Sequence, residues 1–441
     1  MVSAHRQPGG SGTNFDPWYS AYADRTAGLA ASEVRALFAV ASRPEVVSLA
    51  GGMPFVEALP ENLIRAAVES VATKRRTVAL QYGSGNGTPE MRAHILEVMA
   101  LEGIRASVDD VVVTTGSQQA LDLITKLFIN PGDVILAEAP SYVGALGVFR
   151  SYQAEVAHVA MDEDGLIPEA LRAEIARLRG LGKRIKFLYT VPNFQNPAGV
   201  TLTWERRVEI LEIARSNDIL VVEDNPYGLL YFGQPAPRAM RSIEEDGVVY
   251  LGSFSKILAP GLRVGWALAP HAIREKLILA AEAAILSPSV FAQSVITEYL
   301  DAADWKGQIA TYRGIYRERK EAMIAALGEY LPQLEWTNPA GGFYVWVTLP
   351  DHLDSKAMLP RAVKELVAYT PGTAFFADGQ GRNAMRLAFC YPTPEFIHEG
   401  IRRLSVVING ELDLLNTFSQ TNALENIDES HSVIAPPPNL G

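Results

Sequence analysis

Residues 248–265 read VVYLGSFSKILAPGLRVG and place a lysine, Lys256, shortly after a β-branched apolar run. The run is typical of a strand that is buried on both faces. Ser253 and Ser255 lie next to the lysine, and Arg263 follows a Pro-Gly pair. A lysine held at the end of a buried strand is partly desolvated, which favours the neutral amine. Taken alone, the stretch is more typical of a surface turn with an ordinary lysine. Whether Lys256 is functional therefore has to be judged together with the other polar segments of the sequence.

Short apolar runs alternate with stretches of helical period from about Asp110 to Ala269. This alternation predicts stacked βαβ units and a mainly parallel sheet in an α/β fold. We expect helices between the runs, for example over residues 118–128 and 204–214. The expected strands are residues 111–115, 134–137, 187–191, 219–222, 248–251 and 264–268.

A second, smaller unit is expected after the parallel sheet. Residues 343–349 alternate between apolar and other side chains, and residues 386–390 form another apolar run, so both predict strands. The Thr-Pro pair at 393–394 is typical of a helix N-terminus. We expect that helix to run to about Leu414.

The composition narrows the classes of function. The chain has 441 residues, 48% of them hydrophobic, and its 39 basic and 50 acidic residues give a formal net charge of −11. This balance argues against a protein that binds nucleic acid or an anionic membrane. The single cysteine, Cys390, excludes an intramolecular disulfide and a multi-thiolate zinc site. Since the sequence has no long apolar span and no secretion signal, we expect a cytoplasmic protein.

Several common catalytic motifs are missing from the sequence. The seven histidines form no HExxH pair, and no GxxxxGK(S/T), GxGxxG or GxSxG motif occurs. We therefore expect no metal in the site, and neither an ATPase, a Rossmann dehydrogenase nor a hydrolase of the GxSxG type is indicated.

Two further polar segments directly follow expected strands. The segment EDNPY, residues 223–227, begins where the run at 219–222 ends. An acidic residue at the carboxyl end of a strand in an open α/β sheet faces the ligand crevice. The segment PNFQNPAG, residues 192–199, follows another expected strand. Singly, the first segment is also typical of a helix cap and the second of a Pro-Gly turn.

Together and in this order, these segments resemble the pyridoxal-phosphate (PLP)-dependent aminotransferases of fold type I. The most similar group is that of the 2-aminoadipate, kynurenine and aromatic aminotransferases, and the resemblance runs from about Ala31 to Asn409. It implies a mainly parallel, seven-stranded sheet in a large PLP-binding domain and a smaller α/β domain built from both chain ends. The expected division is the N-terminus (1–14), an arm and part of the small domain (15–76), the large domain (77–302), the C-terminal small domain (303–415) and a tail (416–441). Since both ends are polar or Pro-rich, we expect them to be disordered.

The resemblance assigns catalytic roles to four residues. Lys256 would bond covalently to the cofactor aldehyde and move the proton at the substrate carbon. Asp224 would accept the pyridine N–H and keep the ring protonated, which makes the ring an electron sink. Asn196 and Tyr227 would hydrogen-bond the phenolic oxygen. The bond from Asn196 to Pro197 is a candidate cis peptide by the same resemblance.

The resemblance also implies how the rest of the cofactor is held. The cofactor phosphate would bind at a strand–helix junction, where backbone N–H groups and the helix dipole favour an anion. Tyr142 would stack on the ring. Tyr82 resembles the tyrosine that reaches the partner subunit's phosphate, so a homodimer with shared active sites is implied. The phosphate-binding residues would be Gly116, Ser117, Gln118, Ser253, Ser255 and Arg263.

Substrate recognition is implied at both ends of the chain. A planar guanidinium matches a carboxylate with two hydrogen bonds, and Arg386 lies where the family binds the α-carboxylate. The loop that contains Gly52 would let its backbone approach the substrate. Arg35 lies in a segment similar to the helix that supplies an arginine for a distal carboxylate in aminoadipate-type members. A solvated helix arginine is an equally good interpretation of Arg35.

The implied activity is transfer of an amino group from an L-amino acid to a 2-oxo acid such as 2-oxoglutarate by a ping-pong mechanism. The donor would be 2-aminoadipate or an aromatic or branched-chain amino acid. A PLP-dependent C–S lyase is an alternative, because it would use the same cofactor residues. A non-catalytic protein that binds PLP and senses an amino acid is another. No winged-helix domain precedes the match, so DNA binding is not expected.

Overall fold

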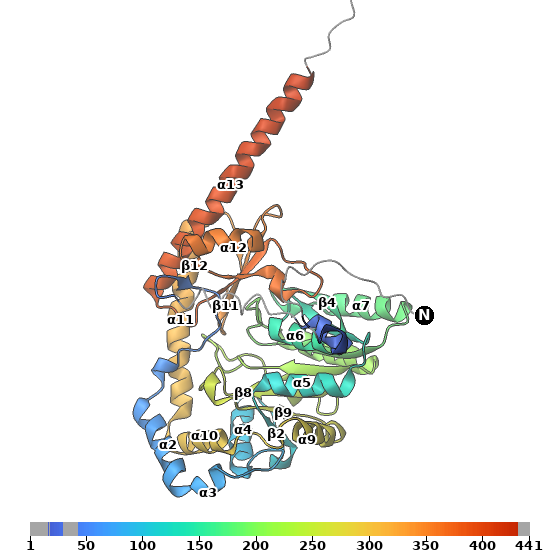
Figure 1. Ribbon diagram of the computed structural model, residues 1–441, viewed down its shortest axis with the longest axis vertical. Coiled ribbons are helices and arrows are strands. Elements are labelled where there is room, and N and C mark those ends of the chain that lie inside the picture. The colour runs from blue at the N-terminus through green and yellow to red at the C-terminus, as the bar shows by residue number, and fades with distance from the viewer. Residues whose placement is uncertain (1–15, 17, 30–42, 431–441) are drawn as a thin grey trace, which may run out of the picture.

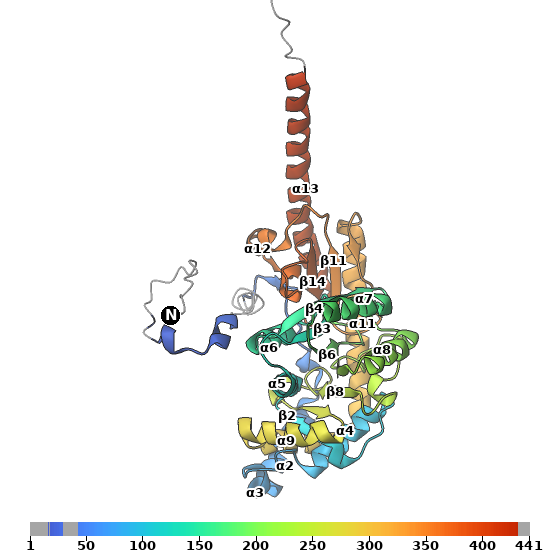
Figure 2. The ribbon, with the colours of Figure 1, turned by 90° about the vertical axis from the view of Figure 1, so that its right-hand side faces the viewer.

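The computed structural model describes residues 16, 18–29 and 43–430. Its larger unit is a sheet flanked by helices (Figure 1). A smaller unit lies next to the sheet and ends in a long helix that projects away from the body (Figures 1 and 2). The sequence before residue 16 and the segment 30–42, which contains Arg35, lie outside the described residues.

The large sheet has eight strands in the order β2-β9-β8-β7-β6-β3-β4-β5. All neighbouring strands are parallel except at β9, which runs against β2 and β8, and at β5, which runs against β4. The carboxyl ends of β6, β7 and β8 therefore meet at one edge. The strands are β2 (Val111–Thr114), β3 (Val134–Ala139), β4 (Glu155–Asp162), β5 (Gly165–Leu166), β6 (Ile185–Thr190), β7 (Leu220–Asp224), β8 (Val248–Ser253) and β9 (Gly265–Leu268).

The six strands expected from apolar runs all lie in this sheet, and the expected α/β fold is confirmed. The sheet has one strand more than the seven expected, since the two-residue β5 forms a hairpin with β4. No apolar run marked β4, because its partly exposed residues include Glu155 and His158. Six parallel pairs join it to β3, and its Ala157 and Val159 pack in the second core.

Helices cover both faces of the sheet, with α5 and α6 on one side and α7 and α8 on the other (Figure 2). Successive residues of β3 point to opposite faces: Ile135 packs in the larger core and Leu136 in a second core with Leu171 and Ile210. The helices of this unit are α2 (Glu61–Lys74), α3 (Arg76–Ala79), α4 (Pro89–Ala100), α5 (Ser117–Phe128), α6 (Val143–Ser151), α7 (Pro168–Gly180), α8 (Trp204–Ser216), α9 (His271–Ile285) and α10 (Val290–Ala302).

The smaller unit has a four-stranded antiparallel sheet in the order β10-β11-β14-β13. An early segment of the chain joins it, because β1 (Val47–Ser48) pairs with β12 (Val367–Ala368) in parallel. The other elements are β10 (Glu335–Trp336), β11 (Tyr344–Thr348), β13 (Thr370–Pro371), β14 (Ala384–Ala388), α11 (Trp305–Tyr330), α12 (Ser355–Lys364) and α13 (Pro394–Ser430).

Short 3-10 helices lie in the connections between these elements. They are η1 (Tyr19–Ala21), η2 (Asp24–Gly28), η3 (Val56–Ala58), η4 (Val108–Asp110), η5 (Met240–Ser242), η6 (Pro260–Leu262) and η7 (Gly372–Phe375). Within the described ranges no single helix is both long and apolar enough to cross a membrane. Helices α9 and α10 meet that test only as a pair, and the pair is bent by 118°.

The C-terminal helix corrects one expectation. Helix α13 continues to Ser430, whereas the sequence predicted a helix end near Leu414 and a disordered tail from residue 416. Residues 416–430 contain neither glycine nor proline, so nothing in them breaks the helix. The proline-rich composition that suggested disorder begins only after this segment.

Candidate active site

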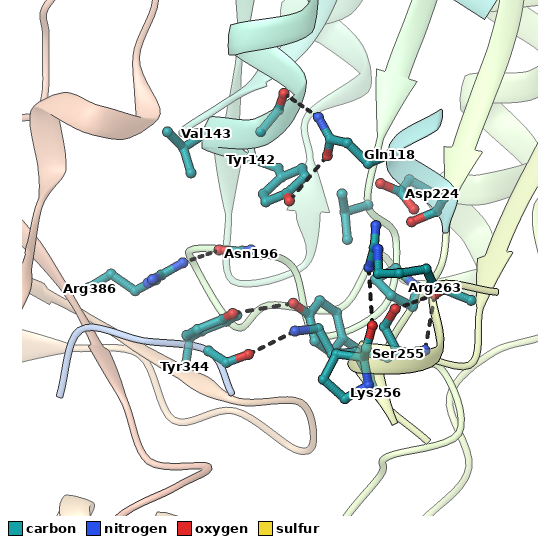
Figure 3. Close-up of a pocket in the computed structure, with 18 residues that line it drawn as sticks. Gln118, Tyr142, Val143, Asn196, Asp224, Ser255, Lys256, Arg263, Tyr344 and Arg386 are labelled. Atoms are coloured by element: carbon teal, nitrogen blue, oxygen red, sulfur yellow. Dashed lines mark hydrogen bonds between the residues drawn. The ribbon is translucent and has the colours of Figure 1, made fainter. Parts of the chain in front are cut away.

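A cavity of about 370 Å³ opens at the carboxyl ends of β6, β7 and β8 (Figure 3). Three parts of the chain form its walls: the segment around Gly52, the loops after the large-domain strands, and Tyr344 and Arg386 of the small sheet. Twelve of the residues expected in the site line this cavity. They are Gly52, Ser117, Gln118, Tyr142, Asn196, Asp224, Tyr227, Ser253, Ser255, Lys256, Arg263 and Arg386.

Lys256 follows β8 after a two-residue gap and points into the cavity (Figure 3). Its Nζ donates a hydrogen bond to the carbonyl oxygen of Gly52 at 2.7 Å. Burial lowers the pKa of Lys256 to about 8, and the nearby cations Arg386 and Arg263 act in the same direction. Lys256 is therefore a much better nucleophile near neutral pH than a solvated lysine.

Asp224 is the last residue of β7 and is buried at the cavity wall. Its Oδ2 accepts a hydrogen bond from the Tyr189 hydroxyl at 2.8 Å, whereas its buried Oδ1 has no partner within the described residues. Burial raises the pKa of Asp224 to about 6, and the Tyr189 hydrogen bond opposes that rise. A buried carboxylate oxygen without a donor fits a cationic N–H, such as a protonated pyridine.

Asn196 and Tyr227 face the same cavity from the loops after β6 and β7. The peptide bond between Asn196 and Pro197 is cis, as the resemblance implied. The Oδ1 of Asn196 accepts a hydrogen bond from Nη1 of Arg386 at 2.8 Å. The hydroxyl of Tyr227 lies 3.3 Å from that of Tyr344, and burial raises the pKa of Tyr227 well above its usual range. Tyr227 is thus a neutral hydrogen-bond donor.

One end of the cavity is suited to an anion. Ser117 begins α5, whose first backbone N–H groups have no partner within the helix. Gly116 caps this helix at a φ of +77°, and a side chain there would collide with the Arg263 guanidinium. Ser253 donates to Ser255 at 2.8 Å beside the same arginine. These donors and positive charge fit a phosphate.

Tyr142 and Gln118 form another part of the cavity wall, next to the start of α5 (Figure 3). The Tyr142 hydroxyl donates to Oε1 of Gln118 at 3.3 Å, and Nε2 of Gln118 donates to the carbonyl of Gly144 at 3.0 Å. Burial raises the pKa of Tyr142 to about 12. The Tyr142 side chain is therefore neutral, its ring forms part of the cavity wall, and its hydrogen bond to Gln118 holds it in position.

Arg386 lies on β14 and is buried. Its Nη2 donates to the Ala50 carbonyl at 2.6 Å and to the Thr370 hydroxyl at 3.3 Å. Its guanidinium carbon lies 4.2 Å from the centre of the Tyr344 ring, and its buried Nε has no partner within the described chain. A buried guanidinium without a paired carboxylate fits a carboxylate ligand.

Tyr344 is the most informative lining residue that sequence reasoning missed. The strand at 343–349 was expected, but alternation alone does not show what a side chain meets across a domain boundary. The Tyr344 hydroxyl lies so close to Gly52 that a β-carbon at that position would collide with it, which explains the glycine. The other unexpected lining residues are Val143, Gly144, Val191, Pro226 and Pro260.

Three residues expected in the site do not line the cavity or cannot be placed. Gly116 lies behind the wall, next to Arg263. Tyr82 is 79% exposed on the surface. Arg35 falls in the segment that the structure does not describe. In the described residues, no group of three His, Cys, Asp or Glu side chains is arranged to hold a metal ion.

Comparisons with known proteins agree with this geometry. The family model "Aminotransferase class I and II" matches residues 45–404. Aromatic-amino-acid aminotransferase 1 of Thermococcus litoralis is 43% identical over 395 residues, which are 89% of this chain and 94% of that protein.

Two solved structures extend the comparison. The kynurenine aminotransferase of Pyrococcus horikoshii, in complex with PMP, has a TM-score of 0.85 and 41% identity, and the match covers 89% of this chain and 97% of that one. The α-aminoadipate aminotransferase of Thermus thermophilus, complexed with N-(5'-phosphopyridoxyl)-L-leucine, has a TM-score of 0.84 and 35% identity, with 90% and 99% covered.

Proposed function

Since the chain belongs to the class I and II aminotransferase family, we propose that it uses an L-amino acid of the 2-aminoadipate, aromatic or branched-chain type as amino donor. It is a PLP-dependent transaminase, and 2-oxoglutarate is the proposed acceptor. The donor class is supported by relatives named for aromatic amino acids, kynurenine and α-aminoadipate. One observation carries the catalytic assignment: a desolvated Lys256 and a carboxylate oxygen without a partner, on Asp224, line the same cavity.

PLP supplies an aldehyde that bonds to amines and a protonated pyridine ring that withdraws electrons from the substrate α-carbon. Asp224 would accept the ring N–H through its free Oδ1. Asn196 and Tyr227 would donate to the phenolic oxygen, and Tyr142 would cover one face of the ring. Ser117, Gln118, Ser253, Ser255 and Arg263, with Gly116 behind them, would hold the phosphate.

Lys256 is the proposed base and acid of the reaction. Its lowered pKa means that a sizeable fraction of the amine is neutral near pH 8, so it can take the proton from the substrate α-carbon. Its hydrogen bond to the Gly52 carbonyl holds the amine on the side of the cavity that Arg386 lines. The lysine can return the same proton to another atom without leaving the cavity.

Arg386 would bind the substrate α-carboxylate with its two Nη groups. Asn196 already contacts this guanidinium and would hold it in position. Gly52 would let the backbone approach the substrate. Arg35, outside the described residues, is the proposed partner of a distal carboxylate. In a ping-pong cycle the product 2-oxo acid leaves before the acceptor enters the same pocket.

We also propose that the enzyme is a homodimer with shared active sites. Tyr82 is 79% exposed, and Val78 and Leu80 near it in sequence are 62% and 73% exposed, so large apolar side chains gather at this part of the surface. Leu286, also exposed, lies near this strip, because Gly83 N donates to the Ser287 hydroxyl at 3.3 Å. Such an apolar strip fits the same surface of a second copy, where Tyr82 would reach the other phosphate site.

Absorbance spectroscopy of the purified protein tests the proposal. Single L-amino acids are added to the PLP form without any oxo acid. A productive donor converts the absorbance band of bound PLP to that of the aminated cofactor, and the set of active donors defines the substrate class. An unchanged band together with pyruvate release would favour the lyase instead. If no cofactor band appears even after PLP is added, the proposal is wrong.

A further inference from the structure

A buried glutamate lies outside the cavity, behind the loops that line it. Glu102 follows α4, is 9% exposed and receives two side-chain hydrogen bonds. Its Oε1 accepts from Nδ2 of Asn225 at 2.9 Å, and its Oε2 accepts from the Tyr250 hydroxyl. Its backbone carbonyl accepts from Ala239 N at 3.0 Å. Both carboxylate oxygens therefore have donors, but none of these contacts belongs to the catalytic assignment given above.

Asn225 links this glutamate to both loops of the cofactor site. It lies between Asp224 and Tyr227 in sequence, and its Oδ1 accepts from Nδ2 of Asn193 at 3.0 Å. The same Oδ1 accepts from the backbone N–H of Gly228 at 3.1 Å. Asn193 belongs to the loop after β6 that carries Asn196, so one amide joins the two loops.

The chain of contacts ends on a buried arginine. The Oδ1 of Asn193 accepts from Nη2 of Arg207. The Nε of the same arginine donates to the carbonyl of Leu202, and its Nη1 donates to that of Arg238. Arg207 is fully buried and anchored on α8. The contacts Glu102–Asn225–Asn193–Arg207 therefore run from the segment after α4, through one residue of each loop, to α8.

Glu102 supplies the acceptor that the orientation of Asn225 requires. A backbone N–H only donates, so Gly228 requires the Oδ1 of Asn225 to face it, and the NH₂ group must then face an acceptor. Ionised Glu102 offers acceptors only. The glycine at position 228 leaves room for the Glu102 carboxylate, because a side chain there would collide with that carboxylate.

We propose that Glu102 is a positioning residue that holds the Asp224–Tyr227 loop and the Asn196 loop in register through Asn225. The inference rests on the proposed function, because these loops carry the proposed contacts to the ring of PLP. Burial raises the pKa of Glu102 to about 7 and Glu223 acts in the same direction, whereas the hydrogen bonds of Tyr250 and Asn225 and the charge of Arg207 favour the ionised form.

Glu102→Gln tests the proposal because it keeps the shape and removes the charge. Glutamine has one acceptor oxygen in place of two, so it cannot accept from Asn225 and from Tyr250 as the carboxylate does, and one of these contacts is lost or weakened. With looser loops, Tyr227 and Asn196 donate less well to the phenolic oxygen, so the deprotonated form of the bound cofactor is stabilised less. We expect the pH midpoint of the absorbance titration of bound PLP to rise by about half a unit, and PLP affinity for the apoprotein to fall roughly tenfold.

Two further variants keep the test decisive. Tyr250→Phe leaves Glu102 and Asn225 in place and should shift the midpoint in the same direction but less; it decides the question if Glu102→Gln fails to fold. Glu97→Gln, at an exposed position on α4, the helix just before Glu102, should change neither the midpoint nor the affinity.

A lower thermal midpoint with an unchanged titration would overturn the proposal, because Glu102 would then be structural only. An unchanged titration and affinity in a stable variant would overturn it as well. If the wild-type protein binds no PLP, the proposed function fails first, and that result is distinct because it needs no variant.

Discussion

The two faces of the cavity satisfy their polar groups in different ways. On the cofactor face, which is built from the ends of β7 and β8 and the start of α5, the Oδ1 of Asp224 has no partner among the described residues. On the substrate face, the two cationic side chains already donate hydrogen bonds to the backbone. Lys256 donates to the Gly52 carbonyl, and Arg386 donates to the Ala50 carbonyl. The first face thus offers a carboxylate oxygen without a donor, whereas on the second face backbone carbonyls already accept from Lys256 and Arg386, and the Nε of Arg386 has no partner among the described residues.

This difference separates two kinds of binding. The groups of the cofactor face are carried by strand ends and a helix start within one hydrogen-bonded sheet, an arrangement that favours preorganisation. On the substrate face, a carboxylate must replace hydrogen bonds that the Arg386 guanidinium already makes, so only the difference in strength between the two sets contributes to affinity. Changes on the first face should therefore alter the chemistry and the spectrum, whereas changes on the second should mainly alter KM.

The largest effect is expected from Lys256, which both faces share. Lys256→Ala removes the proposed base and the covalent anchor, so turnover should fall by on the order of 10⁴-fold or more. Absorbance would still show PLP bound by the other contacts. Normal kcat in this variant would refute the mechanism.

Arg386→Lys is expected to act through binding. A lysine cannot make the paired hydrogen bonds of a guanidinium, so KM for all amino donors should rise by about 10²-fold with a smaller change in kcat. The absorbance spectrum of bound PLP should stay close to that of the wild type. Steady-state kinetics that show kcat falling with KM unchanged would contradict the division between the faces.

The pH dependence of cofactor uptake should follow Lys256. Its pKa is lowered to about 8, so the neutral amine that bonds to PLP increases as the pH rises and reaches half of the total near pH 8. The rate of PLP capture by the apoprotein should therefore increase about tenfold between pH 7 and pH 9 and then level off. Stopped-flow absorbance measures this rate. A rate that keeps rising toward pH 10.5 would mean that the lysine is not desolvated.

Arg35→Ala should give the smallest and most selective effect. If Arg35 binds a distal carboxylate, kcat/KM for 2-aminoadipate or glutamate should fall by roughly fivefold or more, while leucine and phenylalanine are little affected. Competition assays with paired substrates measure the ratio directly. An equal loss for both classes would show that Arg35 does not recognise the distal carboxylate.

Sequence reasoning placed the cofactor face better than the substrate face. Asp224 and Lys256 lie at the ends of continuous apolar strands, and such strands order themselves in a parallel sheet by rules that hold for most α/β folds. β4 was not predicted, because its partly exposed residues, which include Glu155 and His158, interrupt the apolar run that would indicate a strand.

The substrate face depends on contacts that no local pattern contains. Tyr344 was expected only as a strand residue, yet its hydroxyl lies against Gly52 and Tyr227, which are far away in sequence. The network around Glu102 was missed for the same reason, since its partner Tyr250 lies 148 positions further along the chain. Tertiary packing alone brings such pairs together.

The pairing of β1 with β12 has a consequence for the order in which the protein is made. The ribosome releases Val47 early, but its partner Val367 and the donor Arg386 emerge only near the end of translation. The large sheet, from β2 to β9, is complete much earlier. A nascent chain therefore cannot seat Gly52 over Lys256 until the last strands of the small unit have been made, so the site is completed only at the end of translation.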